Sequence, residues 1–216
     1  MKQRINTFYS FLNHMDDKEY FETFLSYSVA LISARLKPSI TMNLIKGGNR
    51  NNFHLWMSYG EEYLKTLGLN YIKLRENHQC LIVLIYDKEL LNEFINKPWN
   101  HEFLNSIGYE NNMPLDGTLK KLKERYDDYN CPHELGIFLG YPLEDVKDFI
   151  ECSKKQCLAC GYWKVYNKFE KAEFIFNIYD EVKETAIKNI IEGKRHKDLS
   201  DILRCEFEQK NSVILG

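Results

Sequence analysis

The chain has 216 residues, of which 44% are hydrophobic and 28% are charged, and its formal net charge is −2. This length predicts one or two domains that can bury a core without disulfides or metals. With 29 basic and 31 acidic residues, the chain lacks the basic excess typical of nucleic-acid binding, so we expect no nucleic-acid partner.

The sequence also predicts a cytoplasmic protein with no membrane partner. Its longest apolar run, Cys80 to Tyr86, is far too short to span a bilayer. The N-terminus begins with basic residues, but polar residues such as Asn13 and Asp16 interrupt the apolar ones after it, so we expect no signal peptide. In the cytoplasm the six cysteines would be reduced thiols.

The N-terminal part of the chain predicts an amphipathic helix over residues 17–36. Asp16 can cap its first turn, and Glu19 lies three residues later, as in a capping box. The helix should end at Lys37, because the residue before a proline avoids the α region.

The next segments predict a small sheet. Alternating apolar residues indicate strands at residues 40–44, ending at the turn Gly47-Gly48-Asn49, and at residues 69–75. Residues 80–86 are apolar on both faces, as in the central strand of a covered sheet. The four-residue connection predicts that 69–75 and 80–86 pair as an antiparallel hairpin, with 80–86 almost fully buried.

Most of the remaining sequence predicts helices. Periodicity and end signals place them at about residues 53–67, 90–95, 99–107, 115–126, from Pro142 onwards, 167–191 and 198–209. Asn167 and Glu170 form a capping pair for the long helix. A short strand is expected at residues 162–166, and residues 137–139 predict either a short strand or a tight turn.

Together these elements predict an α/β (α+β) fold in which a small mixed β-sheet is covered by helices. We expect a single domain over residues 1–192, followed by a polar linker and a C-terminal helix within residues 193–216. Removing this helical extension should leave a folded core. Its apolar residues Leu199, Ile202 and Leu203 predict that the helix docks on a surface, for example on a second copy in a homo-oligomer.

Two long motifs carry a resemblance to a known family. One is HELGIFLGYPLEDV, from His133 to Val146, and the other is CGYWKVY, from Cys160 to Tyr166. With the Lys37-Pro38-Ser39 step and the strand ending at Tyr86, they make residues 20–180 resemble an uncharacterised clostridial family, domain of unknown function 3793. The resemblance implies a cytoplasmic protein of anaerobic Gram-positive bacteria, and it implies no activity.

Cysteine and histidine residues beside these motifs form a candidate metal site. Cys131-x-His133 followed by Cys157-x-x-Cys160 supplies sulfur and nitrogen ligands of the types that hold zinc or iron. Glu134 could orient one of these ligands by a hydrogen bond. The alternative is a set of reduced cysteines near a turn, without a metal.

The same residues allow a thiol enzyme as an alternative. A cysteine nucleophile needs a histidine in contact, and Cys131 with His133 has the right residue types for a thiol hydrolase. Cys157 and Cys160 would be a redox pair, but a strand follows them instead of the helix N-terminus that lowers the pKa of such cysteines.

An anion site is the other binding hypothesis. The turn Gly140-Tyr141-Pro142 leads into a helix whose N-terminus offers free N–H groups and a positive end. Lys37 and Lys164 would be the cations that complete it. A protein-interaction module is the remaining alternative, in which exposed Tyr141, Trp163 and Tyr166 would form a patch.

The leading hypothesis is a non-catalytic or regulatory binding protein that holds a metal ion or a small anionic ligand around residues 131–166. The candidate ligand-binding residues are Lys37, His133, Glu134, Tyr141, Trp163 and Lys164. Short strands at 136–140 and 162–166, joined through one helix, should pair in parallel and bring these flanking residues to the rim of one sheet.

Overall fold

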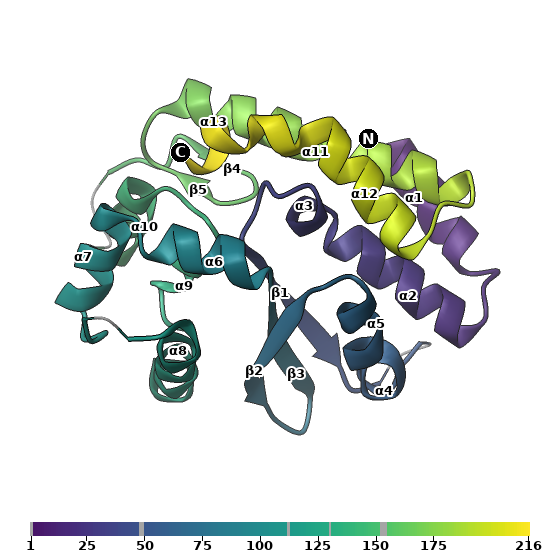
Figure 1. Ribbon diagram of the computed structural model, residues 1–216, viewed down its shortest axis with the longest axis horizontal. Helices are drawn as coiled ribbons and strands as arrows, with labels where there is room; N and C mark the ends of the chain where they lie inside the picture. Colours follow the sequence, from purple (N-terminus) through teal and green to yellow (C-terminus); the bar gives the residue numbers. More distant parts are fainter. Residues whose placement is uncertain (1, 48–49, 112, 130, 152–154) are drawn as a thin grey trace.

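The computed structural model describes residues 2–47, 50–111, 113–129, 131–151 and 155–216, and its central element is a three-stranded antiparallel sheet (Figure 1). The strands β1 (Ser39–Ile45), β2 (Asn70–Glu76) and β3 (Cys80–Tyr86) lie in the order β1-β3-β2. The predicted central strand and its hairpin with β2 are confirmed, but the sheet is antiparallel throughout instead of mixed. The predicted turn at Gly47-Gly48-Asn49 includes residues outside the described ranges.

The central strand is apolar on both faces because each face contacts a different hydrophobic core. Leu81, Val83 and Ile85 pack into the core formed with α2 (Asp17–Ser28), α4 (Asn52–Leu55) and α5 (Glu61–Thr66). Leu84 and Tyr86 pack into the larger core, which includes α6 (Lys88–Ile95) and α8 (Leu115–Tyr129). Figure 1 shows these two groups of helices on opposite sides of the strands.

The predicted helices of the N-terminal half lie where they were expected, but each of two predicted helices consists of shorter helical segments. Asp16 caps α2 by accepting a hydrogen bond from the backbone N–H of Glu19 at 2.8 Å, as predicted. The predicted helix 17–36 is divided at Val29 into α2 and the short helix α3 (Ala30–Ser33). The predicted helix at 53–67 consists of α4 and α5 joined by a π-helical turn, Trp56–Gly60.

The other elements are mostly helices. They are α1 (Lys2–Leu12), α7 (Pro98–Ser106), α9 (Leu135–Phe138), α10 (Leu143–Ile150), β4 (Ala159–Cys160), β5 (Lys164–Val165), α11 (Phe169–Ile191), α12 (His196–Phe207), a 3₁₀ turn (Glu208–Lys210) and α13 (Asn211–Leu215). The predicted fold class, a small sheet covered by helices, is confirmed. No helix of the described residues is long and apolar enough to cross a membrane.

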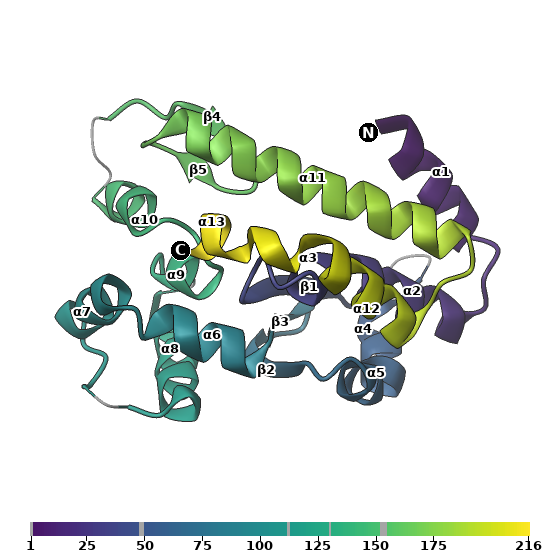
Figure 2. The same ribbon diagram turned by 45° about the horizontal axis from the view of Figure 1, so that its top comes forward.

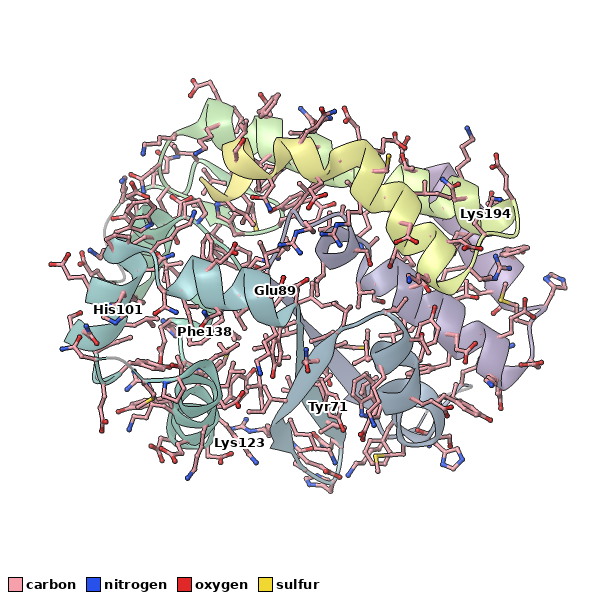
Figure 3. All side chains as sticks on the ribbon, in the orientation of Figure 1. Tyr71, Glu89, His101, Lys123, Phe138 and Lys194 are labelled. Atoms are coloured by element: carbon pink, nitrogen blue, oxygen red, sulfur yellow. The ribbon has the colours of Figure 1, made fainter. Side chains whose placement is uncertain are left out.

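The prediction of parallel strands at 136–140 and 162–166 is wrong. Residues 135–138 form the one-turn helix α9, and β5 pairs with β4 in an antiparallel hairpin. Apolar runs this short suit a buried helix turn as well as a strand, so their composition does not distinguish the two. Phe138, labelled in Figure 3, is fully buried, and its backbone carbonyl accepts a hydrogen bond from Ser39 Oγ at 2.7 Å.

The C-terminal segment packs on the body of its own chain. Helix α12 packs against α11, α3 and α2, and α13 continues from it through the 3₁₀ turn (Figure 2). Their apolar side chains belong to the larger core: Leu199, Leu203, Phe207, Ile214 and Leu215 are all less than 9% exposed. The docking surface predicted for this helix is therefore provided within the chain.

Candidate ligand-binding cleft

Three segments that are far apart in the sequence meet around Tyr141. Gly140 adopts a left-handed φ of +77°, and a Cβ at this position would lie 2.6 Å from Pro38 Cδ. Lys37 Nζ lies 4.8 Å from the centroid of the Tyr141 ring. The ring centroids of Tyr141 and Trp163 are 5.6 Å apart, so the Lys37-Pro38 step and the two long motifs form one structural unit.

Asp145, in the first turn of α10, holds this unit together. Its carboxylate is buried and accepts a hydrogen bond from Trp163 Nε1 at 2.8 Å. It also accepts bonds from the backbone N–H groups of Tyr166 and Asn167, both at 2.9 Å, and from the Asn167 side-chain amide at 3.0 Å. Asn167 thus bonds to Asp145 instead of capping α11 as predicted, and Lys168, with a φ of 45°, takes the capping position.

Substitution of Asp145 by Ala is expected to lower the free energy of unfolding by about 3 kcal/mol or more. The indole and the backbone N–H groups would become buried donors without a partner, and each such group costs about 1–3 kcal/mol. Urea denaturation measures the loss, with exposed Glu170→Ala on neighbouring α11 as the control. Equal losses in the two variants would show that Asp145 does not hold the unit together.

A cavity of about 510 Å³ adjoins this unit, and we call it the three-helix cleft. Residues of the first turns of α7, α10 and α11 line it, and residues of α13 line another side. Its lining includes Phe94, Trp99, Asn100, Tyr141, Glu144, Asp145, Lys147, Trp163, Lys168, Lys171, Tyr179, Ile214 and Leu215. The volume lies within the range of about 300–1,000 Å³ typical of small-molecule sites.

The electrostatic character of the three-helix cleft is positive. Among the described residues, the residues at the N-cap positions of α7, α10 and α11 accept no hydrogen bond with their side chains from the backbone N–H groups of the first turn. Lys168 pairs with Glu144 at 3.3 Å. The Glu144 carboxyl also accepts a hydrogen bond from the backbone N–H of Glu144 itself, and this bond and the Lys168 ammonium lower the pKa of the carboxyl. Within the described ranges, Lys147 and Lys171 form no ion pair, and with Asp145 as the second carboxylate of the lining, the lysines exceed the carboxylates by one.

A second cavity, of about 270 Å³, lies beyond Tyr141, Asp145 and Trp163, which line both cavities. Its lining is mostly apolar, so we call it the apolar pocket. Five of the predicted site residues line it: Cys131, His133, Tyr141, Trp163 and Lys164. The His133 ring packs against Phe149 with centroids 4.9 Å apart, and Lys164 Nζ lies 5.3 Å from the same ring.

Glu134 lies apart from these residues. It is 3% exposed, pairs with Arg125 and accepts a hydrogen bond from the Tyr109 hydroxyl at 3.3 Å. Burial and the Glu134 charge raise the pKa of Tyr109. Glu134 therefore joins the start of α9 to α8, and its contacts give no support to a role in ligand binding.

Among the described residues, the surroundings of the cysteines give no support to the predicted metal site. In the described part of the chain, no group of three or more His, Cys, Asp and Glu side chains could hold a metal ion, so Cys131, His133, Cys157 and Cys160 are not gathered. Burial is the main cause that raises the pKa of Tyr126, and the neighbouring Cys131 thiol raises it further, so this thiol lies beside the Tyr126 hydroxyl. Cys157 Sγ donates to the backbone carbonyl of Ala159 at 3.1 Å.

Two lysines outside the cleft lining, the buried Lys37 and the half-buried Lys183, have lowered pKa values. Lys37 is 5% exposed, and burial lowers its pKa to about 7. Lys183 donates to the backbone carbonyls of Tyr27 at 2.6 Å and Ser28 at 3.2 Å, and burial together with the Lys37 charge lowers its pKa to about 7. The sequence predicted that Lys37 is a cation that completes an anion site. In the structure Lys37 is instead a buried group stacked on Tyr141.

The fold and the cleft define a helix-rich α/β protein with a small antiparallel sheet and a ligand-sized cavity between helix N-termini. Residues 25–200 match the family described as protein of unknown function (DUF3793), and the chain belongs to this family. The resemblance carried by the two motifs is thereby confirmed. Comparisons with curated proteins and with solved structures find no match.

Proposed function

We propose that this protein binds a small anionic organic molecule in the three-helix cleft and acts as a non-catalytic or regulatory binding protein. The observation that carries the proposal is the convergence of three helix N-termini with Lys147 and Lys171 on one cavity. Free N–H groups and the helix dipole favour negative charge at such ends, and lysines without an ion pair add to this preference.

The groups that line the cleft favour binding over catalysis. Asp145 already accepts four hydrogen bonds, and Glu144 pairs with Lys168. Burial raises the pKa of Tyr141, which keeps its hydroxyl protonated at neutral pH. These lining groups offer hydrogen bonds and charge but no activated nucleophile paired with a base, which a hydrolytic or transfer reaction would need.

The alternatives have less support. Trp163 is 7% exposed, and Tyr141 and Tyr166 are half-buried, so these rings do not form the exposed patch of an interaction module. The contacts of Cys131 and Cys157 favour neither a thiol hydrolase nor a redox enzyme. The clostridial origin and the cytoplasmic location that the resemblance implies remain predictions.

Calorimetric titration with pyrophosphate tests the proposal. The double variant Lys147→Gln/Lys171→Gln should bind pyrophosphate at least tenfold more weakly than the wild type, because charge-assisted hydrogen bonds contribute about 1.5–3 kcal/mol each. Binding should also weaken as the salt concentration rises, since the lysines are exposed.

The matched control is Lys188→Gln/Lys194→Gln, which removes the same charge in the last turn of α11 and just after this helix. Both lysines are exposed and absent from the cleft lining, and Figure 3 shows Lys194 at the opposite end of the molecule from His101 of α7. The control should bind pyrophosphate like the wild type. Equal weakening in both double variants, or no binding by the wild type, would refute the proposal.

A further inference from the structure

Trp99 is a feature of the three-helix cleft that anion binding alone does not explain. It lies in the first turn of α7, lines the cavity and is 50% exposed. The other two tryptophans, Trp56 and Trp163, are only 3% and 7% exposed. An indole left half-exposed at the edge of a cavity provides a flat apolar surface on which a planar ring can stack.

Lysine side chains lie close to this indole and to its helix, although Lys97 itself does not line the cleft. Lys97 Nζ is 5.6 Å from the centroid of the Trp99 ring. Burial lowers the pKa of Lys97, and repulsion from the Lys171 ammonium lowers it further, whereas Glu93 offsets part of this shift. Lys147 reaches the same helix, with Nζ 5.6 Å from the Phe103 ring. An anion bound here would relieve the repulsion and lie next to Trp99.

Asn100 adds an independent polar feature. It is 1% exposed, lines the cleft and donates from Nδ2 to the Phe94 carbonyl at 2.9 Å. Its Oδ1 has no hydrogen-bond partner among the residues that the structure describes. An unpaired buried acceptor is costly, so a ligand N–H or O–H group would be favourable here. Because this oxygen is shielded from water, neighbouring side chains must shift to admit such a donor.

We infer that the ligand of the three-helix cleft is a ring-bearing phosphate ester of the nucleotide class. Its phosphate lies at the helix N-termini beside Lys147 and Lys171, and its base stacks on Trp99 and presents an amino group to the Asn100 end of the cleft. The inference rests on the proposed function and adds the ligand class. A phosphate alone would fill a small part of about 510 Å³, whereas a mononucleotide would use the aromatic side as well.

The test compares AMP with ribose 5-phosphate, which has the same sugar phosphate without the base. Stacking on an aromatic side chain contributes about 1–3 kcal/mol, so the wild type should bind AMP about tenfold or more tightly than ribose 5-phosphate. Trp99→Ala should bring the two affinities within about threefold, and Trp99→Phe should keep most of the preference. Phe174→Ala, an exposed ring elsewhere on α11, is the matched control and should leave the preference unchanged.

The outcomes separate this inference from the proposed function. Equal affinities for AMP and ribose 5-phosphate, or an AMP preference that survives in a folded Trp99→Ala variant, would overturn the ligand class. The proposed function would still stand if pyrophosphate binds and depends on Lys147 and Lys171. If neither AMP, ribose 5-phosphate nor pyrophosphate binds the wild type, both fail. Thermal unfolding of each variant shows whether it is folded.

Discussion

Removal of residues 193–216 is expected to abolish cooperative unfolding of the chain. The segment buries five large apolar side chains in the main core: Leu199, Leu203, Phe207, Ile214 and Leu215. Burial of each contributes about 1.5–3 kcal/mol, and together they match the whole stability of a typical domain, about 5–15 kcal/mol. Differential scanning calorimetry of the truncated and complete chains measures the effect.

The sequence alone favoured the opposite result for this truncation, because Gly193 and the charged residues after it are typical of a linker. A point variant gives a finer test. Leu203→Ala should cost about 2–5 kcal/mol, since Leu203 is fully buried, whereas Glu206→Ala on the exposed face of α12 should cost little. A truncated chain that still unfolds in one sharp transition would establish residues 1–192 as an independent domain.

Substitution of Lys37 by Met is expected to increase the free energy of unfolding by roughly 3 kcal/mol at pH 7. The pKa of Lys37 falls from its ordinary value of 10.5 to about 7 in the folded chain, because burial disfavours the ammonium. Each unit of such a shift corresponds to about 1.4 kcal/mol, and loss of the contact with the Tyr141 ring offsets about 1 kcal/mol. Methionine keeps the apolar stem and removes the charge.

The benefit of Lys37→Met should depend on pH in a defined direction. Between pH 7 and about 10.5 the unfolded chain binds this proton more tightly than the folded chain, so wild-type stability rises with pH over this interval. The penalty is complete below pH 7 and disappears as the pH approaches 10.5. The advantage of the variant should therefore shrink from pH 7 to pH 9.5.

Urea unfolding at several pH values measures this difference, with exposed Lys188→Met as the control. Lys183→Met should show the same pH dependence but a smaller gain, because Lys183 also donates to the backbone carbonyls of Tyr27 and Ser28. Since the Lys37 charge contributes to that shift, the two substitutions together should gain less than the sum of their separate effects. An advantage of Lys37→Met that is the same at every pH would argue against a desolvated ammonium.

The sequence predicted correctly those helices and strands that depend on residues close together in the chain. The run from Cys80 to Tyr86 is apolar on both faces, and it became the central strand between two cores. Asp16 was recognisable as a cap three residues before Glu19. Residues 135–138 were harder, because a short apolar run has no measurable period. Their helical state depends on distant partners, such as Ser39, which donates to the Phe138 carbonyl.

The candidate site was predicted only in part for the same reason. The motifs indicated Tyr141 and Trp163, and these rings do lie together, although the parallel strands invoked to explain their proximity do not exist. Lys147, Lys171 and Trp99 were missed. Pro98 and Pro142 marked two of the helix starts, but no local pattern shows that three starts converge on one cavity.

The position of α13 also determines when the cleft can form during synthesis of the chain. Ile214 and Leu215 close one side of it, whereas Phe94 and Trp99 on another side are made more than a hundred residues earlier. The complete cleft therefore forms only after the last of these residues has emerged from the ribosome. Until then the larger core stays open, and contacts between residues so far apart in sequence form slowly.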